Sequence, residues 1–94
     1  MAYIHFAWDE AKSKENIGKH HVSFEEARTV FFDENARLMY DPDHSKSEDR
    51  FVLLGMSRKP RLLLVCHCYR EDDELIRIIS ARKATSAEAR QYGG

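Results

Sequence analysis

Cysteine, proline and glycine are scarce in this chain of 94 residues, which holds two cysteines, two prolines and four glycines. Two cysteines cannot form a disulfide framework, and reduced thiols in a cytoplasmic protein are the simplest interpretation. The longest apolar run, Leu62 to Cys66, is far too short to span a membrane, and the first residues lack the basic and apolar regions of a secretion signal. With 43% hydrophobic and 33% charged residues, the composition is that of a globular domain and excludes a disordered or collagen-like chain.

An excess of one charge is also missing from the chain as a whole, which has 15 basic and 16 acidic residues and a net charge of −1. Taken alone, this balance argues against a strongly basic nucleic-acid-binding protein. The two halves differ, however: residues 1–49 carry a net charge of −5 and residues 50–94 a net charge of +4. From Arg50 to Arg70 there are five basic residues and no acidic one. We therefore expect one positive surface, built from the second half of the chain.

Hydrophobic periodicity predicts a single α+β domain over residues 1–94, in the order β-α-α-β-β-β-β-α. Asp9 is the expected N-cap of the first helix and Gly18 its end, and Ser23 with Glu26 is expected to form a capping box before the second helix. Turns of about four residues join the last three strands, which predicts an antiparallel sheet with the helices packed on one face. The expected elements are a strand at Tyr3–Trp8, a helix at Glu10–Ile17, a helix that buries Phe24, Ala27, Val30 and Phe31, strands at Arg37–Tyr40, Arg50–Ser57, Leu62–Tyr69 and Leu75–Ala81, and a helix at Ala87–Tyr92.

Four stretches of the chain form a recognisable pattern: Phe6–Glu10, Lys19–Ala27, Asp41–His44 with Glu48 and Arg50, and Ile76–Arg82. Their order and spacing resemble the BrnT family of toxins from bacterial type II toxin–antitoxin systems. The most specific parts are the Lys-His-x-Val-Ser-Phe-Glu-Glu-Ala block that begins at Lys19 and the Ile-Ser-Ala-Arg block that ends at Arg82. The resemblance covers nearly the whole chain, from Phe6 to Tyr92.

That resemblance implies a RelE-like fold and a ribonuclease activity that arrests translation. It also implies neutralisation by a BrnA-type antitoxin, whose ribbon-helix-helix module would bind operator DNA, so that this chain itself would contact RNA. No cofactor is implied. The chain departs from the family at His21, where glycine is usual, and a glycine would suit a positive φ after the first helix better than a histidine does. The Cys66–Cys68 segment also lies outside the family pattern.

Lys19 and His20 are predicted catalytic residues, placed on the connection before the second helix. Cleavage of RNA by its own 2′-hydroxyl needs a base for that proton, a cation for the developing phosphate charge and an acid for the leaving oxygen. A histidine suits the first or the third task, and a lysine suits the second. Because isolated histidines are more often structural or solvated, the prediction for His20 depends on the motif, and His21 is assigned no role.

Arg77 and Arg82 are also predicted catalytic residues, and Arg50 and Ser80 are predicted RNA contacts. A planar guanidinium clamps a phosphate and does not lose its charge. Arg77 lies inside an apolar strand, where a charged residue must either form an ion pair or face a functional surface. Strand alternation places Ser80 and Arg82 on one face of the sheet, and Arg77 on the other unless a bulge intervenes.

Arg61 is a further predicted RNA contact, because aromatic and basic residues interleaved on a strand face can stack bases and hold phosphates. His67 and Tyr69 would share that face. The alternative is a face covered by a helix, which would bury both residues, and the sequence does not separate the two. Glu48 is interpreted as a solvated loop carboxylate, with a role as a base or as the partner of an arginine left as the alternative.

Metal ligands are poorly represented. Cys66 and Cys68 supply two thiolates, whereas a structural zinc site needs about four ligands. The turn at Asp41–His44 lacks the glycine and the glutamate of a calcium loop. We therefore expect a metal-independent endoribonuclease. The alternative is a non-enzymatic RelE-like module whose basic face only binds an antitoxin or another partner protein.

Overall fold

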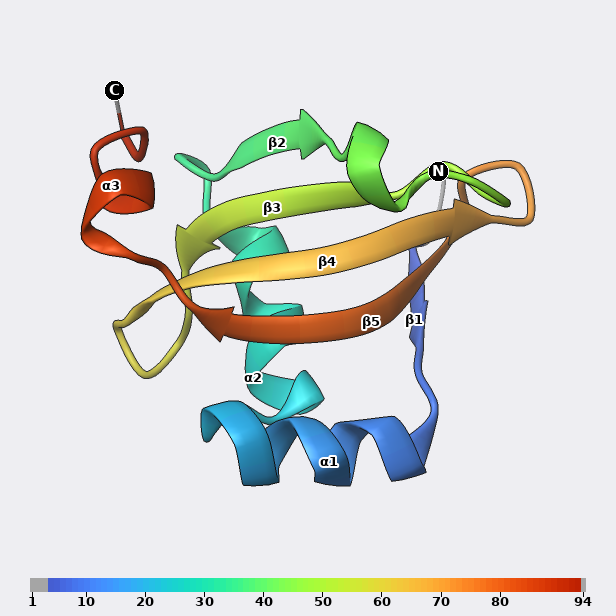
Figure 1. The fold of residues 1–94 in the computed structure, drawn as a ribbon, viewed down its shortest axis with the longest axis horizontal. Coiled ribbons are helices and arrows are strands. Elements are labelled where there is room, and N and C mark those ends of the chain that lie inside the picture. The colour runs from blue at the N-terminus through green and yellow to red at the C-terminus, as the bar shows by residue number, and fades with distance from the viewer. Residues whose placement is uncertain (1–3, 94) are drawn as a thin grey trace.

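The computed structural model describes residues 4–93, which form a five-stranded sheet with helices around it (Figure 1). The α+β class and the order of the elements are confirmed. The strands are β1 (His5–Ala7), β2 (Arg37–Tyr40), β3 (Phe51–Met56), β4 (Leu62–Arg70) and β5 (Leu75–Lys83), the α-helices are α1 (Glu10–His20), α2 (Phe24–Thr29) and α3 (Ser86–Ala89), and the 3-10 helices are η1 (Val30–Phe32) and η2 (Pro42–His44).

The strands lie in the order β1-β5-β4-β3-β2. The pairs β2–β3, β3–β4 and β4–β5 are antiparallel, as the short turns between strands predict. β1 differs from that expectation, since it pairs with β5 in parallel over His5–Ala7. No hairpin joins β1 to β5, which are separated by most of the chain, so the parallel direction is available to this pair.

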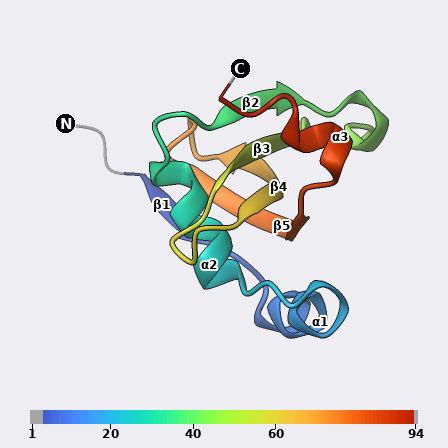
Figure 2. The same cartoon turned by 90° about the vertical axis from the view of Figure 1, so that its left-hand side faces the viewer.

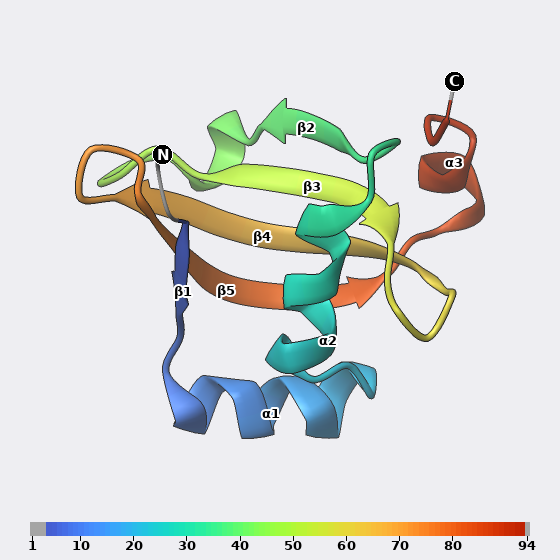
Figure 3. The same cartoon turned by 180° about the vertical axis from the view of Figure 1, so that it is seen from behind.

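The expectation that all helices lie on one face holds for α2, while α1 and α3 differ from it. α2 and η1 pack across one face of the sheet (Figure 3), whereas α1 runs along the edge formed by β5. α3 lies on the opposite side of the sheet from α2 (Figure 2). We call these two sides of the sheet the α2 face and the α3 face.

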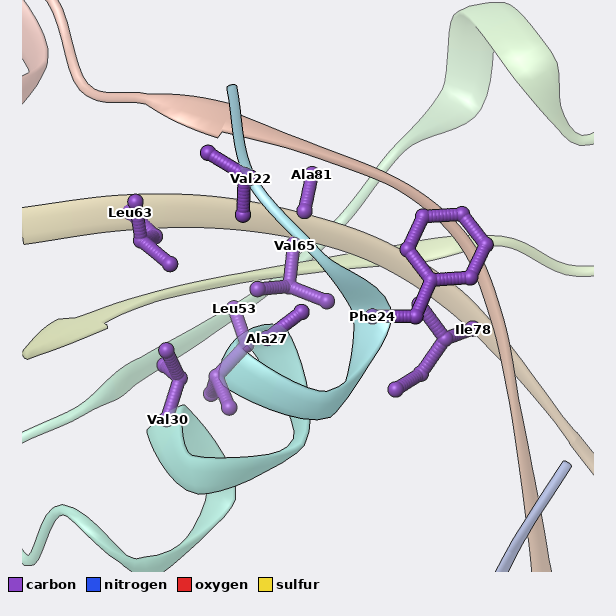
Figure 4. Close-up of a cluster of buried hydrophobic side chains, with 9 residues drawn as sticks. All are labelled: Val22, Phe24, Ala27, Val30, Leu53, Leu63, Val65, Ile78 and Ala81. Carbon is purple, nitrogen blue, oxygen red and sulfur yellow. The ribbon is translucent and has the colours of Figure 1, made fainter. Parts of the chain in front are cut away.

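The apolar core lies between α2 and the sheet (Figure 4). Gly55 allows η1 to approach β3, because a Cβ atom at this position would lie 2.8 Å from Val30 Cγ1 and 2.9 Å from Ala36 Cβ. Among the helices of residues 4–93, none combines the length and the apolar character that crossing a membrane requires. The core side chains are Val22, Phe24, Ala27, Val30, Leu53, Leu63, Val65, Ile78 and Ala81.

Helix α1 is longer than predicted, and this changes the setting of Lys19 and His20. The helix does not end at Gly18 but continues to His20, so both residues lie in its last turn and not on the connection. His21 ends the helix in the left-handed conformation, with a φ of 58°. This is the positive φ that a glycine would adopt more easily.

The predicted helix caps form, with one difference. Asp9 accepts from the backbone of Ala11 at 2.8 Å, and Ser23 Oγ accepts from Glu26 N at 3.0 Å. The carboxylate of Glu26 does not complete the expected capping box, because it binds Ser57 and Arg61 instead. An arginine and a buried hydroxyl compete for this carboxylate more strongly than the backbone amide does.

A bulge in β5 decides which side chains share the α3 face. Cys66 pairs with Ser80 and His67 with Ile78, so Ile79 is an extra residue without a partner on β4. Residues that are paired across two strands point to the same face of the sheet. The partners of Arg77, Ser80 and Arg82 on β4 are Cys68, Cys66 and Leu64, and all three of these partners lie on one face of β4. Arg77 therefore lies on the same face as Ser80 and Arg82, which regular alternation would not produce.

Candidate active site

A cavity of about 210 Å³ lies on the α3 face, where the loop around η2 meets the middle of the sheet. It combines two of the predicted cations, Arg50 and Arg82, with the predicted contact Ser80. Apolar side chains from β3 and β4 form part of its wall. Its lining residues are Asp41, His44, Arg50, Val52, Leu64, Cys66, Ile79, Ser80 and Arg82.

The position of Arg82 is fixed by an ion pair with α3. Its two terminal nitrogens donate to the two carboxylate oxygens of Glu88, each at 2.8 Å. This bidentate pair lowers the pKa of Glu88 to about 2 and raises the pKa of Arg82. Glu88 is itself held at the start of α3 by a reciprocal capping box with Thr85. The guanidinium of Arg82 is therefore permanently charged and anchored at one side of the cavity.

Arg50 reaches the cavity from the residue before β3. Its backbone is fixed on both sides, since its N–H donates to Ser45 Oγ at 2.9 Å and its carbonyl accepts from Asp41 N at 2.9 Å. Its Nη2 lies 3.8 Å from Glu48 Oε1. Its Nε is buried and has no hydrogen-bond partner among residues 4–93. A buried donor without an acceptor is costly.

His44 is a cavity residue that the sequence interpretation missed. Its Nδ1 lies 2.8 Å from Asp41 Oδ2, and its side chain is 67% exposed. With Nδ1–H donated to the carboxylate, the neutral ring presents Nε2 as a proton acceptor. A histidine that follows an aspartate by three residues in a loop can form this pair, and both residues lie in one of the four family-like stretches.

Lys19 and His20 line a second hollow, which meets the cavity at the bulge of β5. Ile79 and Ser80 belong to both sets of lining residues. The ammonium group of Lys19 is held by Glu15 at 2.9 Å, and this contact lowers the pKa of the Glu15 carboxyl. The structure therefore brings Lys19 and His20 next to Ser80, from the side of Ser80 that faces α1. The second hollow is lined by Lys12, Glu15, Asn16, Lys19, His20, Ile79 and Ser80.

Arg61 and Arg77 line neither hollow. Arg61 binds the buried carboxylate of Glu26, with its Nε at 2.7 Å, and donates through Nη2 to the carbonyl of His21 at 2.7 Å. The hydrogen bonds from Arg61 keep the pKa of Glu26 below its usual value. Arg77 is half-buried on the α3 face and forms no ion pair with a carboxylate of residues 4–93. For Glu48, the sequence left open a role as a base or as the partner of an arginine. The structure shows an arginine partner, because Glu48 Oε2 lies 2.6 Å from Arg70 Nη2.

The segment Cys66–Cys68 divides between the two faces. Cys66 lines the cavity, and burial raises the pKa of its thiol. His67 is fully buried on the α2 face, edge to face with Phe31 at a centroid distance of 4.8 Å. The helix-covered alternative for His67 is therefore correct. Within residues 4–93, no three side chains of histidine, cysteine, aspartate or glutamate gather where a metal ion could bind.

Comparison with known proteins agrees with this architecture. Residues 8–88 match the model of the family described as ribonuclease toxin, BrnT, of type II toxin–antitoxin systems. The chain is also similar to the ribonuclease toxin BrnT of Brucella abortus, known from a 1.1 Å crystal structure, with a TM-score of 0.63 and 25% sequence identity over 92% of this chain and 100% of that one. No curated protein sequence matches the chain. The family match covers most of the chain and the fold agrees with it, so the chain belongs to the BrnT family of ribonuclease toxins of type II toxin–antitoxin systems.

Proposed function

We propose that this toxin is a metal-independent endoribonuclease that cleaves RNA within the cavity on the α3 face. The ribose 2′-hydroxyl attacks the adjacent phosphorus, the bond from phosphorus to the 5′-oxygen breaks, and the product carries a 2′,3′-cyclic phosphate. The observation that carries the proposal is the meeting of Arg50, Arg82 and the Asp41-bound His44 in one cavity. These groups supply the charge and the proton acceptor that the reaction requires.

The two arginines bind the scissile phosphate. Arg50 contributes its cavity-lining guanidinium, and Arg82 contributes a guanidinium that Glu88 orients. Both charges stabilise the phosphorane, in which negative charge accumulates on the non-bridging oxygens. Arg77, on the same face, extends the positive surface along the RNA. Arg61 has a structural role in this proposal, because its guanidinium is held by Glu26.

The proton transfers are assigned to two histidines on either side of Ser80. In-line displacement places the attacking and the leaving oxygen on opposite sides of phosphorus, so base and acid must approach from different directions. His44 is the base, because Asp41 holds Nδ1 and leaves Nε2 to accept the proton. His20, in the hollow shared by Ile79 and Ser80, donates to the leaving oxygen, and Lys19 beside it adds positive charge.

The regulatory part of the proposal follows from the family. A type II toxin has a protein antitoxin, and we assign a BrnA-type partner with a ribbon-helix-helix module. This partner suppresses RNA cleavage in the cytoplasm and so relieves the inhibition of translation. Operator DNA is bound by the complex through the antitoxin. An electrophoretic shift of operator DNA by the toxin alone at physiological salt would contradict this division of roles.

Single-turnover cleavage of a short RNA in the presence of EDTA tests the proposed chemistry. Wild-type toxin should retain its rate in EDTA and release a 2′,3′-cyclic phosphate. Replacing either proton-transfer group, as His44→Ala or His20→Ala, should lower the rate by about a hundredfold while RNA affinity changes little. The matched control is His5→Ala, since His5 is exposed on β1 and lines neither hollow.

The arginines should behave differently from the histidines. Arg82→Ala and Arg50→Ala should weaken RNA binding as well as the rate, because a guanidinium contacts the phosphate in the ground state too. Loss of activity in EDTA that Mg²⁺ restores would refute metal independence. Wild-type rates in both histidine variants would remove the proton-transfer assignment. RNA binding without any cleavage would support the alternative of a non-enzymatic binding module.

A further inference from the structure

Strand β2 leaves one edge of the sheet open. It pairs with β3 on one side and forms the border of the sheet on the other (Figure 1). Asp41 N donates to Arg50 O at 2.9 Å. In an antiparallel pair, the backbone groups of successive residues point alternately toward the partner strand and away from it. Met39 therefore directs its N–H and C=O toward β3, and Leu38 and Tyr40 direct theirs outward, away from the sheet. Within residues 4–93 these outward groups have no backbone partner. An exposed edge of this kind is a template for another strand.

An apolar groove of about 470 Å³ adjoins this edge on the α2 face. Its floor is aromatic, with Phe51 edge to face with Tyr69 at 5.3 Å and with Tyr40 at 5.6 Å. The side chains of Leu38 and Tyr40 are 50% and 51% exposed. The two residues that offer free backbone groups therefore also offer unburied apolar surface. The groove is lined by Leu38, Glu48, Asp49, Phe51, Tyr69 and Asp73.

The rim of the groove is acidic. Glu48, Asp49 and Asp73 line it, and the adjoining turn from Glu71 to Glu74 consists of four acidic residues. Arg70 balances Glu48, whereas Asp49 accepts a neutral hydroxyl from Tyr40 at 3.1 Å. Negative charge around an apolar groove repels RNA and favours a ligand that carries both cations and apolar side chains.

We propose that β2 and this groove bind an extended, basic segment of a partner protein by strand addition. Its backbone pairs with Leu38 and Tyr40, and alternate side chains reach the α2 face, where apolar groups contact Phe51 and Tyr69 and a lysine or arginine reaches Asp49. The proposed RNA cavity lies on the α3 face, so a bound segment leaves it uncovered. The proposal goes beyond the assigned function, in which the α2 face has no role, and does not depend on the catalytic assignments.

Calorimetric titration with a synthetic peptide tests the proposal. The probe is a capped ten-residue peptide with threonine at every second position and valine and lysine in turn at the positions between, so that one face carries both the apolar groups and the positive charge. It should bind the full-length toxin with an affinity that falls about tenfold between 50 and 300 mM salt. It should also shift the NMR amide signals of Leu38 and Tyr40. The same peptide with glutamate in place of lysine, or with N-methyl groups on alternate amides, should not bind.

Variants of the toxin locate the binding to β2. Leu38→Pro removes an outward N–H without loss of a β2–β3 hydrogen bond and should weaken binding at least tenfold, whereas Leu38→Val is the matched control and should bind normally. Asp49→Asn keeps an acceptor for Tyr40 and should weaken binding about threefold. Thermal unfolding and RNA cleavage, measured on each variant, establish that the fold and the catalytic site are intact.

Three outcomes would overturn the proposal. The first is equal peptide binding by wild-type toxin and Leu38→Pro. The second is a shift of the Leu38 and Tyr40 signals by an RNA oligonucleotide, which would assign the groove to RNA. The third is a toxin dimer, without peptide, that Leu38→Pro abolishes in sedimentation, which would assign the edge to a second copy of the chain. Because cleavage is measured separately, failure of the peptide to bind would not be confused with an inactive toxin.

Discussion

The side-chain amide of Asn16 pairs with the backbone of Ala81 as a neighbouring strand would. Its Nδ2 donates to Ala81 O at 2.8 Å, and its Oδ1 accepts from Ala81 N at 3.1 Å. β1 pairs with β5 only from Leu75 to Arg77, so this amide satisfies the backbone farther along the same edge. Nδ2 also donates to Val22 O at 2.8 Å. One buried side chain therefore fixes α1, and with it the second hollow, to β5.

Replacement of Asn16 by alanine should destabilise the toxin strongly. The Asn16→Ala variant leaves the backbone groups of Ala81 and Val22 without partners in a buried setting, which should lower the free energy of unfolding by about 2–4 kcal/mol. Urea unfolding at neutral pH measures the change, and Lys14→Ala on the exposed side of α1 is the control. A change below about 0.5 kcal/mol would show that water replaces the amide.

His21→Gly should stabilise the protein. The left-handed conformation at the end of α1 costs a residue with a Cβ about 1 kcal/mol, and a glycine adopts it without this cost. The greater flexibility of glycine in the unfolded chain offsets part of the gain, so we expect about 0.5 kcal/mol. Thermal unfolding should show a higher midpoint than wild type, with His20→Gly, inside the helix, lower. A lower midpoint for His21→Gly would mean that the imidazole makes a compensating contact.

The stability of the toxin should fall as the pH is lowered from 7 to 5, because of His67. Burial lowers the pKa of this residue, so the folded protein keeps the ring neutral while the unfolded chain takes up a proton. The contribution of the neutral His67 to stability is complete at pH values above the pKa of a histidine in the unfolded chain. It is lost as the pH falls toward the pKa of His67 in the folded protein. This one group changes the free energy of unfolding by at most about 1.4 kcal/mol per pH unit.

Urea unfolding of His67→Phe at pH 7 and pH 5 checks this assignment. The variant keeps an aromatic ring beside Phe31 and Tyr69 but cannot be protonated, so the difference between the two pH values should shrink. An unchanged pH dependence in His67→Phe would place the acid sensitivity in another group.

Glu88→Gln should increase the affinity of the toxin for RNA. The carboxylate of Glu88 balances the charge of Arg82 at the cavity, and its removal leaves a full positive charge for phosphate. We expect the dissociation constant for a short RNA to fall about threefold at low salt, with a smaller effect at high salt. Glu25→Gln, at an exposed position on α2, should not change it. Weaker binding by Glu88→Gln would show that the orientation of Arg82 matters more than its unbalanced charge.

Much of the fold could be predicted from the sequence. The boundaries of β2 match the expected Arg37–Tyr40, and β4 extends one residue beyond the expected Leu62–Tyr69. These segments have strong periodicity and are bounded by clear turn residues. The end of α1 could not be predicted, because Gly18 lowers helix propensity by only about 1 kcal/mol. The tertiary contacts of Asn16 outweigh that penalty.

The candidate site was harder to predict than the fold. Arg50, Ser80 and Arg82 do line one cavity, whereas Arg61 is held by a carboxylate 35 residues earlier in the chain, a contact that no local pattern shows. His44 ends the short 3-10 helix η2, a segment whose sequence shows no periodicity that would indicate the direction of the side chain. The bulge at Ile79 was equally hidden, since a run of isoleucines satisfies either alternation.

The extra residue in β5 also determines where this strand can change in length. Without Ile79, β5 would be a regular strand in which Ile78 is followed directly by Ser80. Every second side chain would then point to the α3 face, so Arg77, Ser80 and Arg82 would stay on their present face. Removal of Leu64 from the regular part of β4 would instead exchange core and surface along the rest of that strand. We therefore expect deletion of residue 79 to be tolerated by the fold, and to reshape the boundary between the two hollows without inverting the sheet.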